Sequence, residues 1–222
     1  MDEWNFFIHQ VVPALNRGLV QSMWLILPSA SIGLCLGALV GTLRAYGSLP
    51  LRKACDIYAT VFRGTPLLVQ LFVLYFGLPS IGIYLSPYTA AVLGFILCTG
   101  AYQSEYVRGA FLSIRRGQLL ATQALGFSSM QSMLWVILPQ AMRRALPGCG
   151  NEIIYLIKYS SLAYIITFIE LTGEGKILAV KYFRYTEVFF AIGLYYLFMV
   201  TLANFLLTWL EKKLYIPGFG RG

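Results

Sequence analysis

Long runs of apolar residues, each of a length suited to crossing a membrane, dominate the chain. Five segments of roughly 20 residues show this pattern, and polar residues interrupt mainly the second and the fourth: 20–43, 56–78, 87–107, 148–169 and 187–210. Because lipid offers no partner to free backbone N–H and C=O groups, each segment is expected to be a helix. The pattern predicts an all-α fold, a polytopic membrane bundle of about five transmembrane helices in a single domain over residues 1–222.

Residues 1–17 form a lead-in of a different kind. Its apolar residues follow helical spacing: Trp4, Phe7, Ile8, Val11 and Leu15. Such a pattern suits a short helix lying in the membrane interface before the first span. An ordinary lead-in with an aromatic anchor fits equally well. The acidic start, MDEWNFF, differs from the basic start of a signal peptide.

Composition supports a membrane protein. Of the 222 residues 58% are hydrophobic and 12% are charged, and the mean hydropathy is +0.70. Soluble domains carry about 25% charged residues. The net charge of +8 does not indicate nucleic-acid binding, because the basic residues gather at the ends of the apolar runs. A metal site is not expected, since His9 is the single histidine and the four cysteines lack paired spacing.

The basic residues set the expected orientation. With the N-terminus outside, eleven Lys and Arg residues fall in cytoplasmic segments: Arg44, Arg52, Lys53, Arg108, Arg115, Arg116, Arg143, Arg144, Lys212, Lys213 and Arg221. Four fall in exterior segments: Arg17, Lys176, Lys181 and Arg184. This positive-inside bias places the C-terminus and the loop 108–147 in the cytoplasm.

A polar, helix-prone insert lies within that loop. The stretch from Gln118 to Leu125 is rich in helix formers and small residues, and Gly126 suits a helix C-terminal cap with positive φ. A second amphipathic stretch ends at Leu138-Pro139, where the proline is expected to disturb the helix. Pro147 and Gly148 then punctuate the entry to the fourth span. The insert is either a short helix presented to the cytoplasm or a plain connector between spans.

The insert resembles the coupling loop of permeases of binding-protein-dependent ABC importers. The family pattern is Glu-Ala-Ala, three residues, Gly, nine residues, Ile, one residue and Leu-Pro. Four residues match in register and three differ: Ala121, Gly126, Leu138 and Pro139 match, while Val136 replaces Ile, Leu120 replaces Glu and Thr122 replaces the second Ala. The change at Leu120 removes any salt bridge that the family glutamate would make to the ATPase.

The resemblance extends over most of the chain. The segments FRGTPLLVQ (62–70), LPQAMRRALPG (138–148) and GNE…LIKYSSL (150–162) resemble the polar amino-acid branch of these permeases. This resemblance implies an ABC type I importer-like bundle in the inner (plasma) membrane of a bacterium. It also implies a second permease subunit, identical or a sister, an ATPase dimer and an external substrate-binding protein.

The resemblance implies a division of labour between the chains. The residues expected to meet the ATPase are Leu119, Leu120, Ala121, Thr122, Ala124, Leu125 and Gly126. ATP and Mg²⁺ are expected on the ATPase, with no cofactor and no catalytic residue on this chain. The segment Gly173–Lys176 superficially resembles a phosphate loop, but it lacks the spaced first Gly and the Ser or Thr after Lys.

Two polar clusters lie inside predicted spans, where a charge costs roughly 2.5–3.5 kcal/mol. In the second span Arg63 is followed by Gly64, Thr65 and Pro66, which weaken or break a helix. A broken span often lines a transport site. Arg63 and Thr65 therefore belong either to a substrate path or gate, or to a packing kink from which Arg63 reaches the cytoplasmic face.

The fourth span carries a polar stripe: Asn151, Tyr155, Lys158 and Ser161. Residues three or four apart share a helix face, and this face is expected to point to the bundle interior. We expect Glu152 on the translocation path, facing the amino group or a cationic side chain of the substrate. The alternative is that Glu152 pairs with Arg63, and Lys158 with Glu105 or a carbonyl group.

These features predict the permease subunit of an ABC importer for a polar or basic amino acid. An importer of another solute, such as an osmolyte or a metal, is a rival within transport, although the sequence shows no Met, His and Cys lining for a soft metal. An integral membrane enzyme would need a catalytic set of histidines or paired carboxylates, and the sequence suggests none. A stand-alone channel would leave the insert without a purpose.

Overall fold

The computed structural model describes residues 3–214, and none of these residues lies in a strand. The helices are α1 (Glu3–Phe6), α2 (Val12–Tyr46), α3 (Leu49–Gly64), α4 (Leu67–Phe72), α5 (Pro87–Leu112), α6 (Arg116–Ala124), α7 (Ser129–Ser132), α8 (Leu138–Tyr159), α9 (Leu171–Tyr182) and α10 (Tyr185–Lys213). Short π-helical and 3₁₀ segments extend several of them. The predicted all-α bundle is confirmed.

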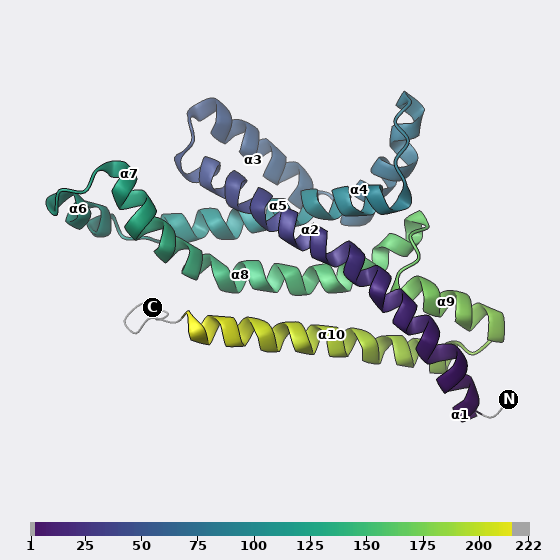
Figure 1. Cartoon of the computed structure of the whole chain (residues 1–222). Helices are drawn as coiled ribbons and strands as arrows, with labels where there is room; N and C mark the ends of the chain where they lie inside the picture. The colour runs from purple at the N-terminus through teal and green to yellow at the C-terminus, as the bar shows by residue number, and fades with distance from the viewer. Residues whose placement is uncertain (1–2, 215–222) are drawn as a thin grey trace.

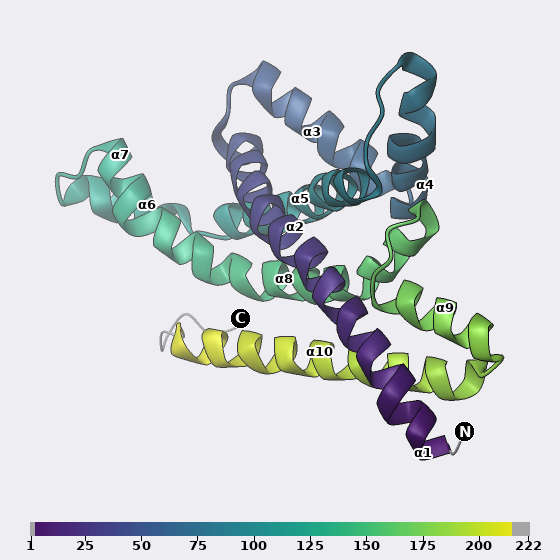
Figure 2. The same cartoon turned by 45° about the vertical axis from the view of Figure 1, so that its right-hand side comes forward.

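The long helices run between two ends of the molecule (Figures 1 and 2). One end, which we call the coupling end, holds α6, α7 and the nearby termini of α2, α5, α8 and α10. The described chain starts at the opposite end and finishes at the coupling end. A chain that crosses the membrane an odd number of times has its two termini on opposite sides, and the predicted topology of five spans has this arrangement. Arg221, one of the basic residues used for that topology, lies outside the described residues.

The lead-in does not form a separate helix. A π-helical turn at Phe7–Val11 joins α1 to α2, so that Glu3–Tyr46 is one helix. Phe6, Val11 and Leu15 are buried, and the Phe6 ring packs edge-on against Tyr182 of α9 with ring centroids 5.1 Å apart. The lead-in therefore continues the first span and packs against other helices of the chain.

Glycines bring α2 and α5 into close contact at the centre of the bundle. Gly33, Gly37 and Gly41 lie four residues apart on one face of α2, and a Cβ atom at any of them would collide with α5. Small residues at this spacing allow two membrane helices to approach until their backbones nearly touch. The glycine face therefore fixes α2 against α5.

The second predicted span is broken where the sequence indicated. α3 ends at Gly64, α4 begins at Leu67, and the chain bends by 102° between them. The Gln70 side chain holds the bend, because its Nε2 donates to the Phe62 and Thr65 carbonyl oxygens at 2.8 and 3.0 Å. A buried amide thus satisfies carbonyl groups that have no helical partner at the break; for Phe62 the partner position is Pro66, which has no N–H.

The fourth predicted span is longer than expected, and its prolines do not break it. The helix runs without interruption from Ser129 through a π-helical turn at Met133–Ile137 into α8 and on to Ile166. Pro139 lies in the first turn after the π segment, and Pro147 lies inside α8. The expected disturbance at Pro139 is present as the π-helical turn just before it. Pro147 and Gly148 do not mark the entry to a separate span, because α8 continues through them, as neighbouring helices can accommodate proline in membrane helices.

A second bend follows that helix. Thr167 adopts a left-handed conformation with φ of 66°, and α9 begins at Leu171 after a turn of 54°. Residues 171–182 form a helix that the sequence analysis did not predict. Its N-terminus is capped by the fully buried Glu170, which accepts from the N–H groups of Thr172 and Gly173 at 2.9 and 3.0 Å.

Within residues 3–214, two helices are long and apolar enough to cross a membrane, Glu3–Tyr46 and Tyr185–Lys213, and the count reaches four if each bent pair forms one span. The remaining predicted span, α5, is not among them. Its middle carries Thr99, Gln103 and Ser104, which are buried against other helices. α5 is therefore shielded by its neighbours, chiefly α2, α3 and α8.

Candidate functional site

The insert at the coupling end forms the predicted helix. α6 spans Arg116–Ala124 and ends in a Schellman motif, with Gly126 at φ of 84°. The N–H of Phe127 donates to the Thr122 carbonyl oxygen at 3.0 Å, and the N–H of Gly126 donates to that of Gln123 at 3.0 Å. The predicted positive φ of Gly126 is confirmed, because this cap needs a left-handed residue at its turn.

The next helix, α7, is capped by side-chain hydrogen bonds at its N-terminus. The Ser128 hydroxyl accepts from the N–H of Gln131 at 3.3 Å, and the Gln131 side chain accepts from the N–H of Ser128 at 2.8 Å. This capping box satisfies two N–H groups at the start of α7. The turn between α6 and α7 is consequently held at both sides.

One of the predicted coupling residues faces inward. Thr122 is buried, and its hydroxyl donates to the Ser132 Oγ at 2.7 Å, which ties α6 to α7. The others are exposed or half-buried: Leu119, Leu120, Ala121, Ala124, Leu125 and Gly126. Leu120 and Leu125 expose 55% and 76% of their surface. α6 thus presents an apolar, small-residue face away from the bundle.

A basic side chain ties the insert to the membrane helices. Arg144 of α8 donates to the carbonyl oxygen and the hydroxyl of Ser113 at 2.8 and 2.9 Å, immediately before α6. Both ends of the insert are therefore fixed to α8. A force applied to α6 would reach α8 without passing through a flexible segment.

Arg63 lies at the C-terminal end of α3, beside the first bend. Its Nη1 pairs with Glu105 Oε2 of α5 at 2.6 Å, and its guanidinium lies over the Tyr102 ring at 5.7 Å. The alternative pairing of Arg63 with Glu152 is not present. Thr65 lies in the break and accepts from Gln70 Nε2 at 2.9 Å.

Glu105 is the centre of a charge cluster that joins three helices. It pairs with Arg44 of α2 at 3.0 Å and with Arg108 one turn away at 3.1 Å, in addition to Arg63. Arg44 is buried and also pairs with Asp56 of α3 at 2.7 Å. The sequence analysis assigned no role to this cluster, because nothing in the local pattern shows that residues 44, 56 and 105 meet.

The polar stripe of the fourth span faces outward. Asn151, Tyr155 and Lys158 are exposed on the surface of this chain, and Ser161 is half-buried. The prediction that the stripe points into the bundle is therefore wrong for the single chain. Lys158 does not pair with Glu105; its Nζ lies over the Tyr155 ring at 4.2 Å.

Glu152 is buried, unlike the stripe, although it lies only about 100° around the helix from Asn151. Its side chain is 4% exposed and has no ion-pair or hydrogen-bond partner among residues 3–214. It lies within electrostatic range of Cys98 and Tyr106 of α5 and of Tyr159 of α8. A carboxylate in this position has no charge partner within the described chain.

The fold and these two sites can be compared with known proteins. The family model described as binding-protein-dependent transport system inner membrane component matches residues 32–215. The chain belongs to this family. It is 36% identical over 211 residues to the glutamine transport system permease protein GlnP of Escherichia coli (strain K12), covering 94% of this chain and 96% of that protein.

Two further comparisons agree with the family. The chain is 38% identical over 201 residues to the probable amino-acid ABC transporter permease protein YckA of Bacillus subtilis (strain 168), covering 90% of this chain and 89% of that protein. A solved structure described as an amino acid ABC transporter with histidines contains a chain that superposes with a TM-score of 0.88 at 30% identity, covering 96% of this chain and 99% of that one. The predicted family is confirmed, and the chain is a membrane protein and a transporter component.

Four tyrosines of this permease lie on α5 and on α8, the helix of the buried carboxylate. Tyr102 and Tyr106 lie on α5, and the stacked rings of Tyr155 and Tyr159 lie on α8 with centroids 6.1 Å apart. Tyr106, Tyr155 and Tyr159 are 37%, 45% and 40% exposed. The sequence analysis named only Tyr155. The i, i+4 spacing of each tyrosine pair is a signal that could have revealed the cluster.

Proposed function

We propose that this chain is the permease subunit of an ATP-driven importer for a polar amino acid in the inner membrane of a bacterium. The observation that carries the proposal is an exposed helix, α6, tied at both ends to the helix that bears Glu152. ATP and Mg²⁺ bind to a separate ATPase dimer, and an external binding protein delivers the substrate. The relatives named for amino acids support the substrate class.

The uninterrupted helix from Ser129 to Ile166 supplies the mechanical link. Ser132, bonded to Thr122 of α6, lies twenty residues before Glu152, which is about 30 Å at 1.5 Å per residue. When ATP closes the ATPase dimer, α6 moves with the groove that holds it, and α8 carries this movement into the membrane. ATP acts through its different affinity for the two arrangements of the transporter.

A second permease subunit covers the polar stripe. Asn151 and Lys158 lie on an exposed face of a membrane helix, and a charge facing lipid there is costly. A partner subunit, identical or a sister, removes this cost by packing on that face. The substrate path then runs between the two subunits, lined by the stripe and by the tyrosines.

Glu152 is the residue to which the path owes its selectivity. A buried carboxylate with no internal partner can accept the ammonium group of an amino acid, or a cationic side chain, when the transporter opens toward it. Arg63 lies at the end of α3 and Thr65 in the break that follows it, and Arg63 pairs with Glu105 of α5. This arrangement favours polar and basic amino acids.

Docking of α6 is tested with Ala124→Asp in the reconstituted transporter. The new carboxylate lies on the exposed face of α6 and would be buried when the ATPase docks there. It is therefore expected to stop uptake while membrane insertion and basal ATP hydrolysis continue. Ala124→Ser, which changes little in size, serves as the matched control. Normal uptake by Ala124→Asp would refute the docking assignment.

The role of Glu152 is tested by amino-acid uptake into proteoliposomes. Glu152→Gln keeps the shape and removes the charge, so the loss of one charge-assisted hydrogen bond should lower uptake roughly tenfold or more. Glu174→Gln is the control, because Glu174 lies on α9, at the end of the molecule opposite to the coupling end. Full uptake by a correctly assembled Glu152→Gln transporter rules the role out.

A further inference from the structure

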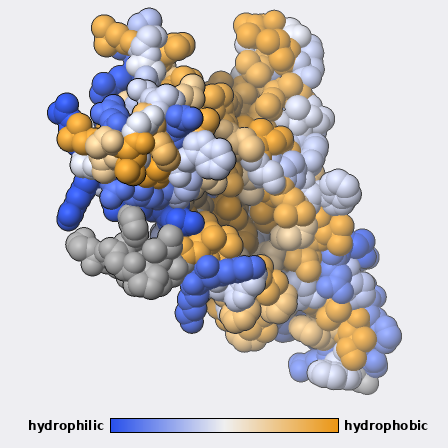
Figure 3. Space-filling view, turned by 60° about the vertical axis from the view of Figure 1, so that its left-hand side comes forward, coloured by the Kyte–Doolittle hydropathy of each residue, from blue (hydrophilic) through white to orange (hydrophobic). Residues whose placement is uncertain are grey.

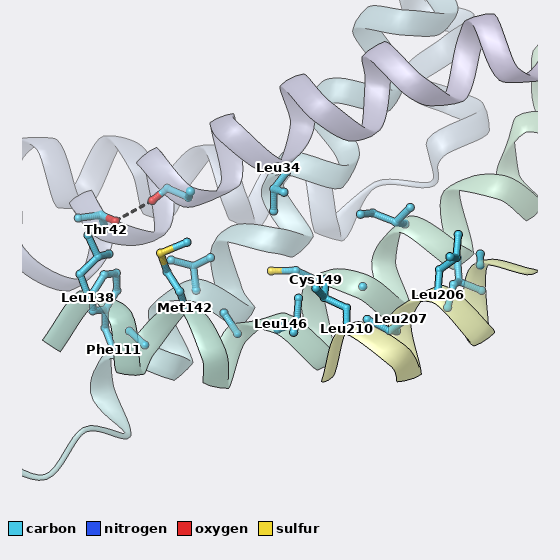
Figure 4. Close-up of a pocket in the computed structure, with 18 residues that line it drawn as sticks. Leu34, Thr42, Phe111, Leu138, Met142, Leu146, Cys149, Leu206, Leu207 and Leu210 are labelled. Carbon is cyan, nitrogen blue, oxygen red and sulfur yellow. Dashed lines mark hydrogen bonds between the residues drawn. The ribbon is translucent and has the colours of Figure 1, made fainter. Parts of the chain in front are cut away.

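An apolar pocket opens on the face of α8 that carries none of the proposed path residues. Its volume is about 520 Å³, and it lies between α2, α8 and α10 with the end of α5 at its edge (Figure 4). The labelled side chains that define it include Leu34 and Thr42 of α2, Met142 and Cys149 of α8, and Leu206 and Leu210 of α10. The Thr42 hydroxyl is already used, since it donates to the Ala38 carbonyl oxygen at 2.7 Å. The pocket therefore offers almost no polar group to a ligand.

The pocket and the polar stripe lie on opposite faces of α8. Residues on a helix advance by about 100° each, so Cys149, which lines the pocket, and Asn151, which belongs to the stripe, point to nearly opposite sides. The stripe is the face that must avoid lipid. The pocket face meets α10, which exposes large apolar side chains such as Phe198, Phe205 and Trp209 beside a few polar ones, among them Asn204. These large apolar side chains make lipid, rather than a second subunit, the expected surrounding of the pocket face.

Basic side chains stand at the coupling end of the pocket. α8 and α10 run antiparallel, and Gly150 lies against Leu207. Seven residues further on each helix, about 10 Å away, this register places Arg143 beside the C-terminal end of α10, next to Lys213. Arg143 and Lys213 form no ion pair among residues 3–214.

The charge at this end is positive in sum. Lys212 accompanies Arg143 and Lys213, whereas Arg144 is engaged with Ser113. Glu211 is the one carboxylate on the last turn of α10. Figure 3, in which the coupling end comes forward, shows hydrophilic side chains beside a hydrophobic hollow. An apolar cleft that ends at cations has the chemistry of a phospholipid site: the cleft suits an acyl chain, and the cations suit the phosphate.

We propose that the pocket binds one anionic phospholipid from the leaflet at the coupling end. An acyl chain fills the space between α2, α8 and α10, and the phosphate lies between Arg143 and Lys213. The bound lipid fills a gap beside α8, the helix that links α6 to the path. The side of the membrane rests on the proposed function, whereas the site itself depends on the described contacts alone.

The test measures lipid retained by the purified transporter, with its ATPase, in native mass spectrometry. The probes are phosphatidylglycerol and phosphatidylcholine with the same acyl chains. The unaltered transporter is expected to retain one phosphatidylglycerol per permease chain, in preference to phosphatidylcholine. Because retention is read without transport, a failure of the importer assignment would leave this result unchanged.

Two variants with matched controls locate the lipid. Ala38→Trp fills the pocket from an exposed position on α2 and should abolish retention, whereas Leu39→Trp, equally exposed but outside the pocket, should retain the lipid. The double variant Arg143→Gln/Lys213→Gln should remove the preference for phosphatidylglycerol, whereas Arg52→Gln/Lys53→Gln on α3 should not. Unchanged retention by Ala38→Trp would overturn the proposal. So would equal retention of both lipids, or a disulfide between two permease copies through Ala38→Cys.

Discussion

The two bends of this permease are held by opposite chemistry. At the first, after Gly64, the free groups are carbonyl oxygens at the end of α3, and the buried amide of Gln70 donates to them. At the second, before Leu171, the free groups are N–H groups at the start of α9, and the buried carboxylate of Glu170 accepts from them. Each bend is completed by one buried polar side chain of the matching polarity.

The bends also differ in their origin. Pro66 disfavours continuation of the helix, both at its own position and at Thr65 before it. The first bend therefore has a cause in the local sequence. The second bend has no proline or glycine at its turn; Thr167 is held in a left-handed conformation by the packing around it. A bend imposed by tertiary contacts should depend more on its polar side chain than a bend imposed by proline.

The largest effect is expected from Glu170→Leu. The change removes a carboxylate that accepts two backbone hydrogen bonds and the hydroxyl of Tyr196 at 2.9 Å. Leaving these donors buried without partners should lower the free energy of unfolding by about 3 kcal/mol. Denaturant unfolding of the purified permease in detergent measures this loss. Tyr196→Phe keeps the cap and should cost about 1 kcal/mol; equal costs would show that the cap contributes little.

A smaller loss is expected from Gln70→Leu. The leucine fills the same space but cannot donate to the Phe62 and Thr65 carbonyl oxygens, and the expected cost is about 2 kcal/mol because the lost bonds are neutral. The same unfolding measurement checks it. Thr65→Val is the control, because it leaves both carbonyl acceptors of Gln70 in place and removes only the Thr65 hydroxyl, which accepts from Gln70 and donates to the Val61 carbonyl oxygen. A cost for Gln70→Leu above that of Glu170→Leu would reverse the comparison.

Pro66→Ala should change stability by less than about 1 kcal/mol and leave the bend in place, because Pro66 and Gln70 hold the first bend redundantly and either one suffices. The distance between spin labels at the exposed Ile57 and Ile81, measured by double electron–electron resonance, reports the bend. The double variant Pro66→Ala/Gln70→Leu should lengthen this distance. Straightening by Pro66→Ala alone would show that proline, and not the amide, maintains the first bend.

The smallest effect, a gain, is expected from Thr167→Gly. A β-branched residue in the left-handed region costs about 1–2 kcal/mol, and glycine relieves this cost while adding freedom to the unfolded chain. The net gain in the free energy of unfolding should be about 0.5 kcal/mol, after loss of the contact between the Thr167 hydroxyl and Tyr75 at 3.2 Å. Thr167→Val is the control and should not stabilise. A loss on Thr167→Gly would mean that the contact to Tyr75 outweighs the strain.

Features with a local cause could be predicted from the sequence. The cap at Gly126 and the break at Gly64–Pro66 need only neighbouring residues, and both are present as expected. The family followed from the same segments. The second bend and α9 could not be predicted, because they depend on contacts between residues far apart in the sequence. Thr167 contacts Tyr75, Glu170 accepts from Tyr196 of α10, and the Leu171 N–H donates to the Ser22 hydroxyl of α2 at 3.2 Å.

The candidate site was predicted in part for a related reason. Glu152 is buried within a span, and its place on the path stays a prediction. The stripe that includes Lys158 faces outward, because helical spacing groups residues on one face without saying what covers that face. The effect of Pro147 on the fourth span was predicted wrongly for a third reason. Pro147 would end a short helix in water, whereas within a bundle it is accommodated inside α8.

The polar middle of α5 constrains how the ribosome and the insertion machinery must deliver this chain. The polar residues Thr99, Gln103 and Ser104 make insertion of α5 alone into lipid unfavourable. α2 and α10, by contrast, are hydrophobic enough to insert without a neighbouring helix. α2 is made first and carries the glycine face that receives these residues. α5 should therefore leave the translocon only once α2 is beside it, and replacing Gly37 by a large residue should strand α5 during synthesis and expose the nascent chain to proteolysis.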